Sequence, residues 1–341
     1  METNMETKYE QNKEEGINEE KLKFYEEKLD ALKKEISKVV IGQTEIVKMV
    51  LVSLICDGHA LLEGVPGLAK SLLVETLART IEGTTHKRIQ FVPDMLPADI
   101  IGVNAYNPKT GEFYIIKGPV FANFILADEI NRAPPKTQAA MMEVMQERKV
   151  NISTQEFKFP RPFLVLATQN PIEQYGTYPL PEAIVDRFFM KLILDYPKPE
   201  EEMIILDENT MTKYNKIDVV KPVLNPNDII ELQNSVRKVF ISKPVKKYIV
   251  DLVNTSRGRG VHIQGLKYVK YGGSPRATIW LALGARAIAL MNGRDFVVPD
   301  DISEVAHHVM RHRLILNYEG KAAGISTDEL VDNILNSVEV P

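Results

Sequence analysis

Short apolar segments alternate with helix-forming segments between residues 60 and 194, and this alternation restricts the fold more than any other feature. Near-continuous apolar strands separated by helices are typical of a parallel sheet that is covered by helices on both faces. We therefore predict an α/β domain built on a five-stranded parallel sheet. The predicted strands are Ala60–Glu63, Arg88–Val92, Phe124–Ala127, Phe163–Ala167 and Met190–Leu194.

The segments on either side of this region differ from it in composition. Residues 1–18 are polar and charged, which is typical of a disordered tail. Pro197 and Pro199 mark a boundary after the last predicted strand, and helical signals dominate beyond it. We predict a tail over 1–18, an α/β domain over 19–196 and a smaller all-α domain over 197–341. The α/β domain opens with a helix whose apolar residues share one face: Leu22, Tyr25, Leu29, Leu32, Ile36 and Val39.

Two further segments of the α/β domain have the pattern of β-hairpins. Residues 103–117 carry turn-forming residues between apolar flanks, and residues 149–160 carry apolar residues on both sides of a polar centre. In the second hairpin we expect Val150 and Ile152 to lie opposite Phe157 and Phe159. Both hairpins are predicted insertions into the alternating α/β pattern.

Composition excludes several classes of protein. Cys56 is the only cysteine, so the chain cannot form an internal disulfide framework. No segment approaches the roughly 18 uninterrupted apolar residues of a membrane helix, and the N-terminus lacks an apolar signal core. A net charge of −4 gives no general reason to expect nucleic acid as the main partner. We expect a cytoplasmic protein with no membrane span.

A phosphate-binding loop is predicted directly after the first strand. Its sequence is Gly64-Val65-Pro66-Gly67-Leu68-Ala69-Lys70-Ser71, and a helical segment follows. In a strand–loop–helix context, backbone N–H groups and the helix N-terminus bind phosphate oxygens. Lys70 would then reach the β- and γ-phosphates of a nucleotide, and the Ser71 hydroxyl would ligate magnesium. The alternative is a glycine-rich turn that starts a helix and binds nothing.

Ala69 departs from the general pattern G-x-x-x-x-G-K-[ST], which has glycine before the lysine. Alanine adds one methyl group, which a backbone in the right-handed helical region tolerates. We therefore predict a negative φ at Ala69, with its N–H directed at the phosphates.

Polar residues follow two of the buried strands. Asp128 and Glu129 end the strand that begins at Phe124, at the sheet edge where open α/β proteins bind ligands. Asp128 suits a magnesium contact, and Glu129 suits a base that orients an attacking water. Asn170 ends the next strand and could reach the same water or the γ-phosphate. Read alone, each segment is also compatible with an ordinary strand end that runs into a turn.

Two arginines are further candidates. Arg187 follows a short helix, and its proximity to Asp186 in sequence is also compatible with a surface ion pair. Arg276 lies in the first turn of a helix that Ser274 caps, where a cation opposes the helix dipole. This placement favours a nearby anion, although solvent exposure explains it almost as well.

Together these motifs resemble the MoxR family of AAA+ ATPases, in the branch with an insert in helix 2 and a hairpin before sensor 1. The resemblance extends from about residue 35 to the end of the chain. Its segments are "VVIGQ" (39–43), "EGVPGLAKS" (63–71), "RIQFVPDMLPADIIG" (88–102), "GPVFANFILADEINRAPPKTQAAMMEVMQE" (118–147), "FLVLATQNPIEQYGTYPLPEAIVDRFFMKL" (163–192), "GGSPRA" (272–277) and "MRHRLILNYE" (310–319).

The resemblance implies roles that spacing alone does not supply. The family's pattern at this loop is GxPGxAK[ST], which would account for Ala69. Leu72 would extend the nucleotide-binding segment. Asn170 would be sensor 1, Arg276 sensor 2, and Arg187 an arginine finger that acts on a neighbouring subunit's nucleotide. Val40 and Ile41 would border the adenine. Gln90 stands where related ATPases can carry a polar switch residue that restrains the catalytic glutamate.

The resemblance also implies a function. The family's pattern predicts an ATPase that uses ATP and Mg²⁺, forms a ring (usually a hexamer) and remodels protein complexes as a chaperone does. A partner with a von Willebrand factor A domain is expected with it. The alternatives are a DNA-directed motor or loader, which the acidic net charge disfavours, a scaffold that holds nucleotide without turnover, and a small-molecule kinase.

Overall fold

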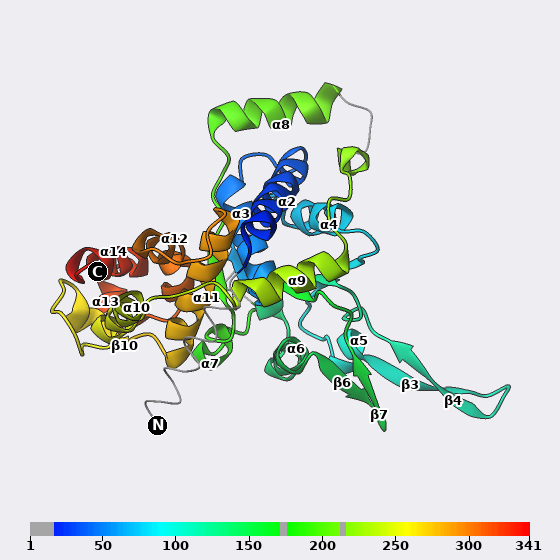
Figure 1. Ribbon diagram of the computed structural model, residues 1–341. Helices are drawn as coiled ribbons and strands as arrows, with labels where there is room; N and C mark the ends of the chain where they lie inside the picture. The colour runs from blue at the N-terminus through cyan, green and yellow to red at the C-terminus, as the bar shows by residue number, and fades with distance from the viewer. Residues whose placement is uncertain (1–16, 171–175, 212–215) are drawn as a thin grey trace, which may run out of the picture. The chain divides into compact units, whose positions relative to one another are not determined.

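The computed structural model describes residues 17–170, 176–211 and 216–341 of the chain (Figure 1). The predicted tail lies outside these residues, apart from Ile17 and Asn18. The chain divides into two compact units. Unit 1 comprises Met1–Asp30, Val185–Lys191 and Glu231–Pro341, and unit 2 comprises Ala31–Ile184 and Leu192–Ile230. Each unit is a set of residues that pack mainly on one another. The domain limits of 19–196 and 197–341 stay a prediction.

A five-stranded sheet forms the centre of the α/β core, as predicted, with the strand order β2-β5-β8-β1-β9. Neighbouring strands run parallel where β2 pairs with β5, β5 with β8 and β8 with β1. Their carboxyl ends therefore lie at one edge of the sheet. The strands are β1 (Ala60–Glu63), β2 (His86–Gln90), β5 (Phe124–Asp128), β8 (Leu164–Gln169) and β9 (Met190–Ile193).

The helices of the core follow the apolar periodicity of the sequence. The first predicted helix is α2 (Glu19–Ser37), and its six predicted apolar positions, Val39 included, are all buried. Helix α4 packs on β5 and β2, so the loop that precedes it lies over the carboxyl edge of the sheet. The remaining helices up to the proline boundary are α3 (Thr44–Ile55), α4 (Lys70–Thr80), α5 (Pro97–Ile101), α6 (Pro135–Glu147) and α7 (Glu182–Val185).

Both predicted hairpins are present. Strand β3 (Gly102–Asn107) pairs antiparallel with β4 (Glu112–Lys117), and β6 (Lys149–Ile152) pairs antiparallel with β7 (Gln155–Lys158). Strand β3 contacts β6, and the hairpins extend side by side in Figure 1. The register of the second hairpin differs in part from the prediction. Val150 does face Phe157, but Ile152 faces Gln155 because the turn is tighter than expected.

Helices dominate the chain beyond Pro197, as predicted. Ser274 caps α11, since its side chain accepts a hydrogen bond from the Arg276 N–H at 3.1 Å. Within the described ranges, no helix combines the length and apolar character needed to span a bilayer. The elements are α8 (Pro199–Met211), α9 (Pro226–Val236), α10 (Lys243–Ser256), β10 (Val269–Tyr271), α11 (Pro275–Met291), α12 (Pro299–Met310), β11 (Ile315–Leu316), α13 (Tyr318–Ala322) and α14 (Thr327–Ser337).

A buried histidine connects β1 to its neighbours in the core. The Nδ1 atom of His59 accepts the Val165 N–H at 3.0 Å, so the ring proton lies on Nε2, which donates to the Met145 carbonyl at 3.0 Å. Burial, and secondarily the charge of Arg148, lowers the pKa of His59 to about 3, and the bond to Met145 opposes this shift only weakly. The neutral ring is therefore the native form.

We predict that His59 makes the fold sensitive to acid. Its pKa lies near 3 when folded and near 6.5 when unfolded, so its contribution is complete above pH 6.5 and is lost as the pH falls toward 3. Between pH 7 and pH 5, the wild type should lose about 2 kcal/mol more unfolding free energy than His59→Gln, which cannot titrate. Urea denaturation at both pH values measures this difference. An equal loss in both proteins would contradict the prediction.

Candidate functional site

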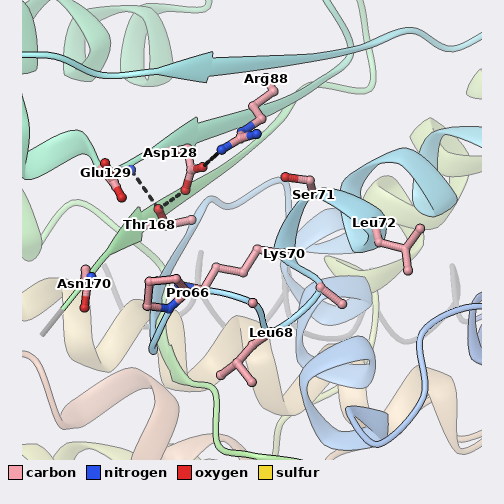
Figure 2. Close-up of a pocket in the computed structure, with 12 residues that line it drawn as sticks. Pro66, Leu68, Lys70, Ser71, Leu72, Arg88, Asp128, Glu129, Thr168 and Asn170 are labelled. Carbon is pink, nitrogen blue, oxygen red and sulfur yellow. Dashed lines mark hydrogen bonds and ion pairs between the residues drawn. The ribbon is translucent and has the colours of Figure 1, made fainter. Parts of the chain in front are cut away.

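The loop from Gly64 to Ser71 joins β1 to α4 and forms one wall of a cavity of about 400 Å³ (Figure 2). The opposite wall comes from the carboxyl ends of β2, β5 and β8. Positively and negatively charged side chains both line the cavity. The lining residues are Pro66, Gly67, Leu68, Ala69, Lys70, Ser71, Leu72, Arg88, Asp128, Glu129, Thr168 and Asn170.

The predicted backbone at Ala69 is wrong. Its φ is +53° and its ψ is 22°, in the left-handed region, where an L-residue is disfavoured by roughly 1–2 kcal/mol. The Ala69 carbonyl already accepts the first hydrogen bond of α4, from the Leu73 N–H at 2.9 Å. The chain must turn into the helix axis at this one residue, and the helical conformation that we expected there would not make this turn.

Lys70 closes the loop on itself. Its Nζ donates to the Gly64 carbonyl at 2.5 Å, so the side chain lies along the inner side of the loop. Burial lowers the pKa of Lys70 below its ordinary value, while the charges of Asp128 and Glu129 oppose that shift. The amine therefore lies in a partly desolvated position near two carboxylates.

Thr168 holds the two carboxylate residues in place. Its hydroxyl donates to Asp128 Oδ1 at 2.6 Å and accepts the Glu129 N–H at 2.8 Å. The register of β5 and β8 places Ala127 opposite Ala167, so the next residues of the two strands end side by side. The sequence reasoning missed Thr168, although a hydroxyl near the end of a buried apolar strand was a usable signal.

Glu129 is held by neighbouring polar groups. Its backbone is left-handed, with φ +56° and ψ 49°. Its Oε2 accepts Gln90 Nε2 at 2.7 Å and lies 3.2 Å from Arg132 Nε. The amide that we predicted as a switch residue therefore contacts the carboxylate it was expected to restrain.

Arg88 is a second residue that the sequence reasoning missed. Its Nε and Nη2 donate to Asp128 Oδ2 at 3.0 and 2.6 Å, and Nη2 also donates to Gln90 Oε1 at 2.8 Å. Residues two apart in a strand share a face, so the spacing of Arg88 and Gln90 was the available signal.

Some of the remaining predicted residues of unit 2 line one of two cavities, and the others line neither. Ser71 and Asn170 line the first cavity, and Figure 2 shows the Ser71 hydroxyl on the side that faces Asp128. A second cavity of about 380 Å³ adjoins the loop and is lined by Ile41 and Val39, while Val40 is buried and lines neither cavity. Gly64 and Val65 belong to the loop but also line neither cavity. The other lining residues of the second cavity are Gln43, Pro66, Gly67, Leu68, Ala69, Leu72, Tyr196, Pro197, Glu202, Ile205 and Asn209.

Arg187 and Arg276 lie in unit 1, where Asp186 organises the surrounding groups. Asp186 accepts from Arg276 Nη1 at 3.1 Å and from Arg313 Nε at 3.0 Å. Arg313 is only 3% exposed and also donates to the Asp186 and Phe188 carbonyls. Asp186 thus pairs with two distant arginines. The Arg187 Nε is buried and has no hydrogen-bond partner among the residues that the structure describes.

Comparison with known proteins shows which family the chain belongs to. Residues 59–190 match the ATPase family associated with various cellular activities (AAA), and residues 267–334 match the AAA lid domain. Chaperone MoxR1 of Mycobacterium tuberculosis is 45% identical over 90% of this chain and 81% of its own length. Protein MoxR of Methylorubrum extorquens is 30% identical over 90% of this chain and 94% of its own length.

A solved structure agrees with these relatives. It comes from Cytophaga hutchinsonii, is 46% identical and superimposes with a TM-score of 0.87, covering 95% of this chain and 98% of its own. The sheet order and the residues at its carboxyl edge fit the same assignment. The chain therefore belongs to the MoxR family of AAA ATPases, with an α/β AAA core followed by a helical lid region.

Proposed function

We propose that this protein binds ATP with Mg²⁺, hydrolyses it, and works as a ring that remodels protein complexes. The observation that carries the proposal is the cavity between the phosphate loop and the Asp128–Glu129 pair. Membership of the AAA ATPase family implies ATP binding. The relative named Chaperone MoxR1 supports a remodelling role.

The residues around the cavity fit a nucleoside triphosphate with a divalent cation. The loop from Gly64 to Ser71 and the first turn of α4, which includes Leu72, would offer backbone N–H groups to the phosphates, and Lys70 adds a positive charge. The Ser71 hydroxyl and the Asp128 carboxylate are oxygen donors of the kind that Mg²⁺ prefers. The second cavity, with the apolar residues Val39 and Ile41, suits a nucleobase next to these phosphate groups. Val40 lies between Val39 and Ile41 in sequence but is buried and lines neither cavity, so its proposed contact with the base rests on the family resemblance alone.

The chain's own residues supply the remaining chemistry. Bound Mg²⁺ would polarise phosphoryl oxygens and offset their charge. Glu129 would accept a proton from a water molecule and orient it, and Asn170 would position the same water from the next strand. Gln90 Nε2 donates to Glu129 Oε2 at 2.7 Å, so Oε2 would have to leave this contact in order to accept the proton. Arg276 would serve as sensor 2.

The exposed hairpin β3–β4 supports a protein client. Five of its large apolar side chains are 42–68% exposed, and the antiparallel register distributes them over both faces. Exposed apolar groups of this kind mark contact sites for other proteins. The residues are Val103, Tyr106, Phe113, Tyr114 and Ile116. A partner with a von Willebrand factor A domain remains part of the proposal on the family resemblance alone.

The hydrolytic role is tested with Glu129→Gln, which keeps the shape of the side chain but cannot accept a proton. ATP hydrolysis should fall by about 100-fold or more while nucleotide binding persists. Phosphate release and the binding of a fluorescent ATP analogue measure the two effects. Glu143→Gln, at an exposed position of α6, is the matched control and should hydrolyse ATP as the wild type does. Unchanged turnover in Glu129→Gln would remove the mechanism.

Assembly with shared sites is tested by mixing two inactive variants. Arg187 is proposed to act on the nucleotide of a neighbouring subunit, so Arg187→Ala alone should bind nucleotide without turnover. A mixture of Arg187→Ala with Glu129→Gln should regain part of the activity, because some interfaces then contain an intact Glu129 and an intact Arg187. Mass photometry of the same mixtures reports the ring size. Mixed rings without regained activity would contradict a shared site.

A further inference from the structure

Arg88 is the cation that occupies Asp128 in this structure. The guanidinium reaches Asp128 from β2, and its side chain is 55% exposed while that of Asp128 is 15% exposed. Two nitrogens, Nε and Nη2, donate to the same carboxylate oxygen, Oδ2. The third contact, from Nη2 to Gln90 Oε1 at 2.8 Å, fixes the plane of the guanidinium.

Both oxygens of Asp128 are therefore engaged. Oδ1 accepts the Thr168 hydroxyl at 2.6 Å, and this hydroxyl also accepts the Glu129 N–H, so the contact belongs to the framework of the site. Oδ2 carries the Arg88 ion pair, which includes the more exposed partner. A divalent cation that binds at Oδ2 therefore competes with Arg88.

The competition is between two positive charges. An arginine side chain does not lose its proton in proteins, so Arg88 leaves Asp128 only by moving away. A divalent cation and a guanidinium cannot share one carboxylate oxygen without strong repulsion at this distance. Binding of the cation at Oδ2 thus requires that the ion pair be broken.

We propose that Arg88 is a resident counter-ion that holds Asp128 in place and that a nucleotide-bound divalent cation must displace it. Arg88 acts through Asp128 and is a positioning residue. The inference rests on the proposed function, because it assumes that Asp128 is a cation ligand. Arg88 should therefore weaken the dependence of nucleotide affinity on the metal. Without the metal, Arg88 neutralises the Asp128 charge, and with the metal, Arg88 competes for the same carboxylate.

The test compares the affinity for a non-hydrolysable ATP analogue with Mg²⁺ and with EDTA, measured by calorimetry. In Arg88→Gln the ratio of the two affinities should rise by about threefold to tenfold, the range expected for a partly exposed ion pair with charge-assisted hydrogen bonds. Arg88→Lys keeps a positive charge near Asp128, so its ratio should stay within about twofold of the wild type. Melting temperatures of each variant confirm that it is folded.

The matched control is Arg79→Gln. Arg79 is 53% exposed and forms an ion pair with Asp218 away from both cavities. The ratio of the two affinities in Arg79→Gln should therefore equal that of the wild type. An unchanged or smaller ratio in Arg88→Gln would overturn the inference while leaving metal-dependent binding by the wild type intact. A wild type that binds no nucleotide would overturn the proposed function and this inference together.

Discussion

The hydrogen bonds of one hydroxyl determine where the functional groups of this site lie. Thr168 joins Asp128 and Glu129 at the edge where β5 and β8 end, and it can do so only because the two strands are parallel and in register. A shift of one residue would turn Thr168 to the other face of the sheet. The buried apolar faces of β5 and β8 prevent that shift.

Charge balance explains how so many polar groups lie close together in the cavity. Asp128 pairs with Arg88, and Glu129 lies beside Arg132 and Gln90. Lys70 donates to its own loop. Asp128, Glu129 and Lys70 thus each have an internal partner, so nucleotide binding at these three residues would exchange one partner for another.

Elements with strong periodicity were predictable because local sequence determines them. The five strands, the helix over 19–37 and both hairpins follow from apolar spacing and turn residues. Residues at strand ends were also predictable as a group, since parallel strands bring their carboxyl ends to one edge. This reasoning placed Asp128, Glu129 and Asn170 beside the loop, although their roles stay proposals.

The features that escaped prediction depend on contacts between distant segments or on local strain. Arg88 and Thr168 reach Asp128 only when β2, β5 and β8 pair, and no spacing within one strand specifies those two contacts. Arg313 is buried against Asp186, more than a hundred residues away in the chain. At Ala69 the expectation relied on the conformational preference of alanine, but the start of α4 imposes a left-handed residue there.

The central claim is that the loop and the carboxylates form one nucleotide site, and calorimetry on a Lys70 variant tests it most directly. A non-hydrolysable ATP analogue with Mg²⁺ should bind the wild type at one site per chain, and Lys70→Ala should bind it about tenfold more weakly or worse. Lys149→Ala, which alters an exposed ion pair with Glu156, should bind like the wild type. Equal affinity in Lys70→Ala and the wild type, or no binding by the wild type, would contradict the account.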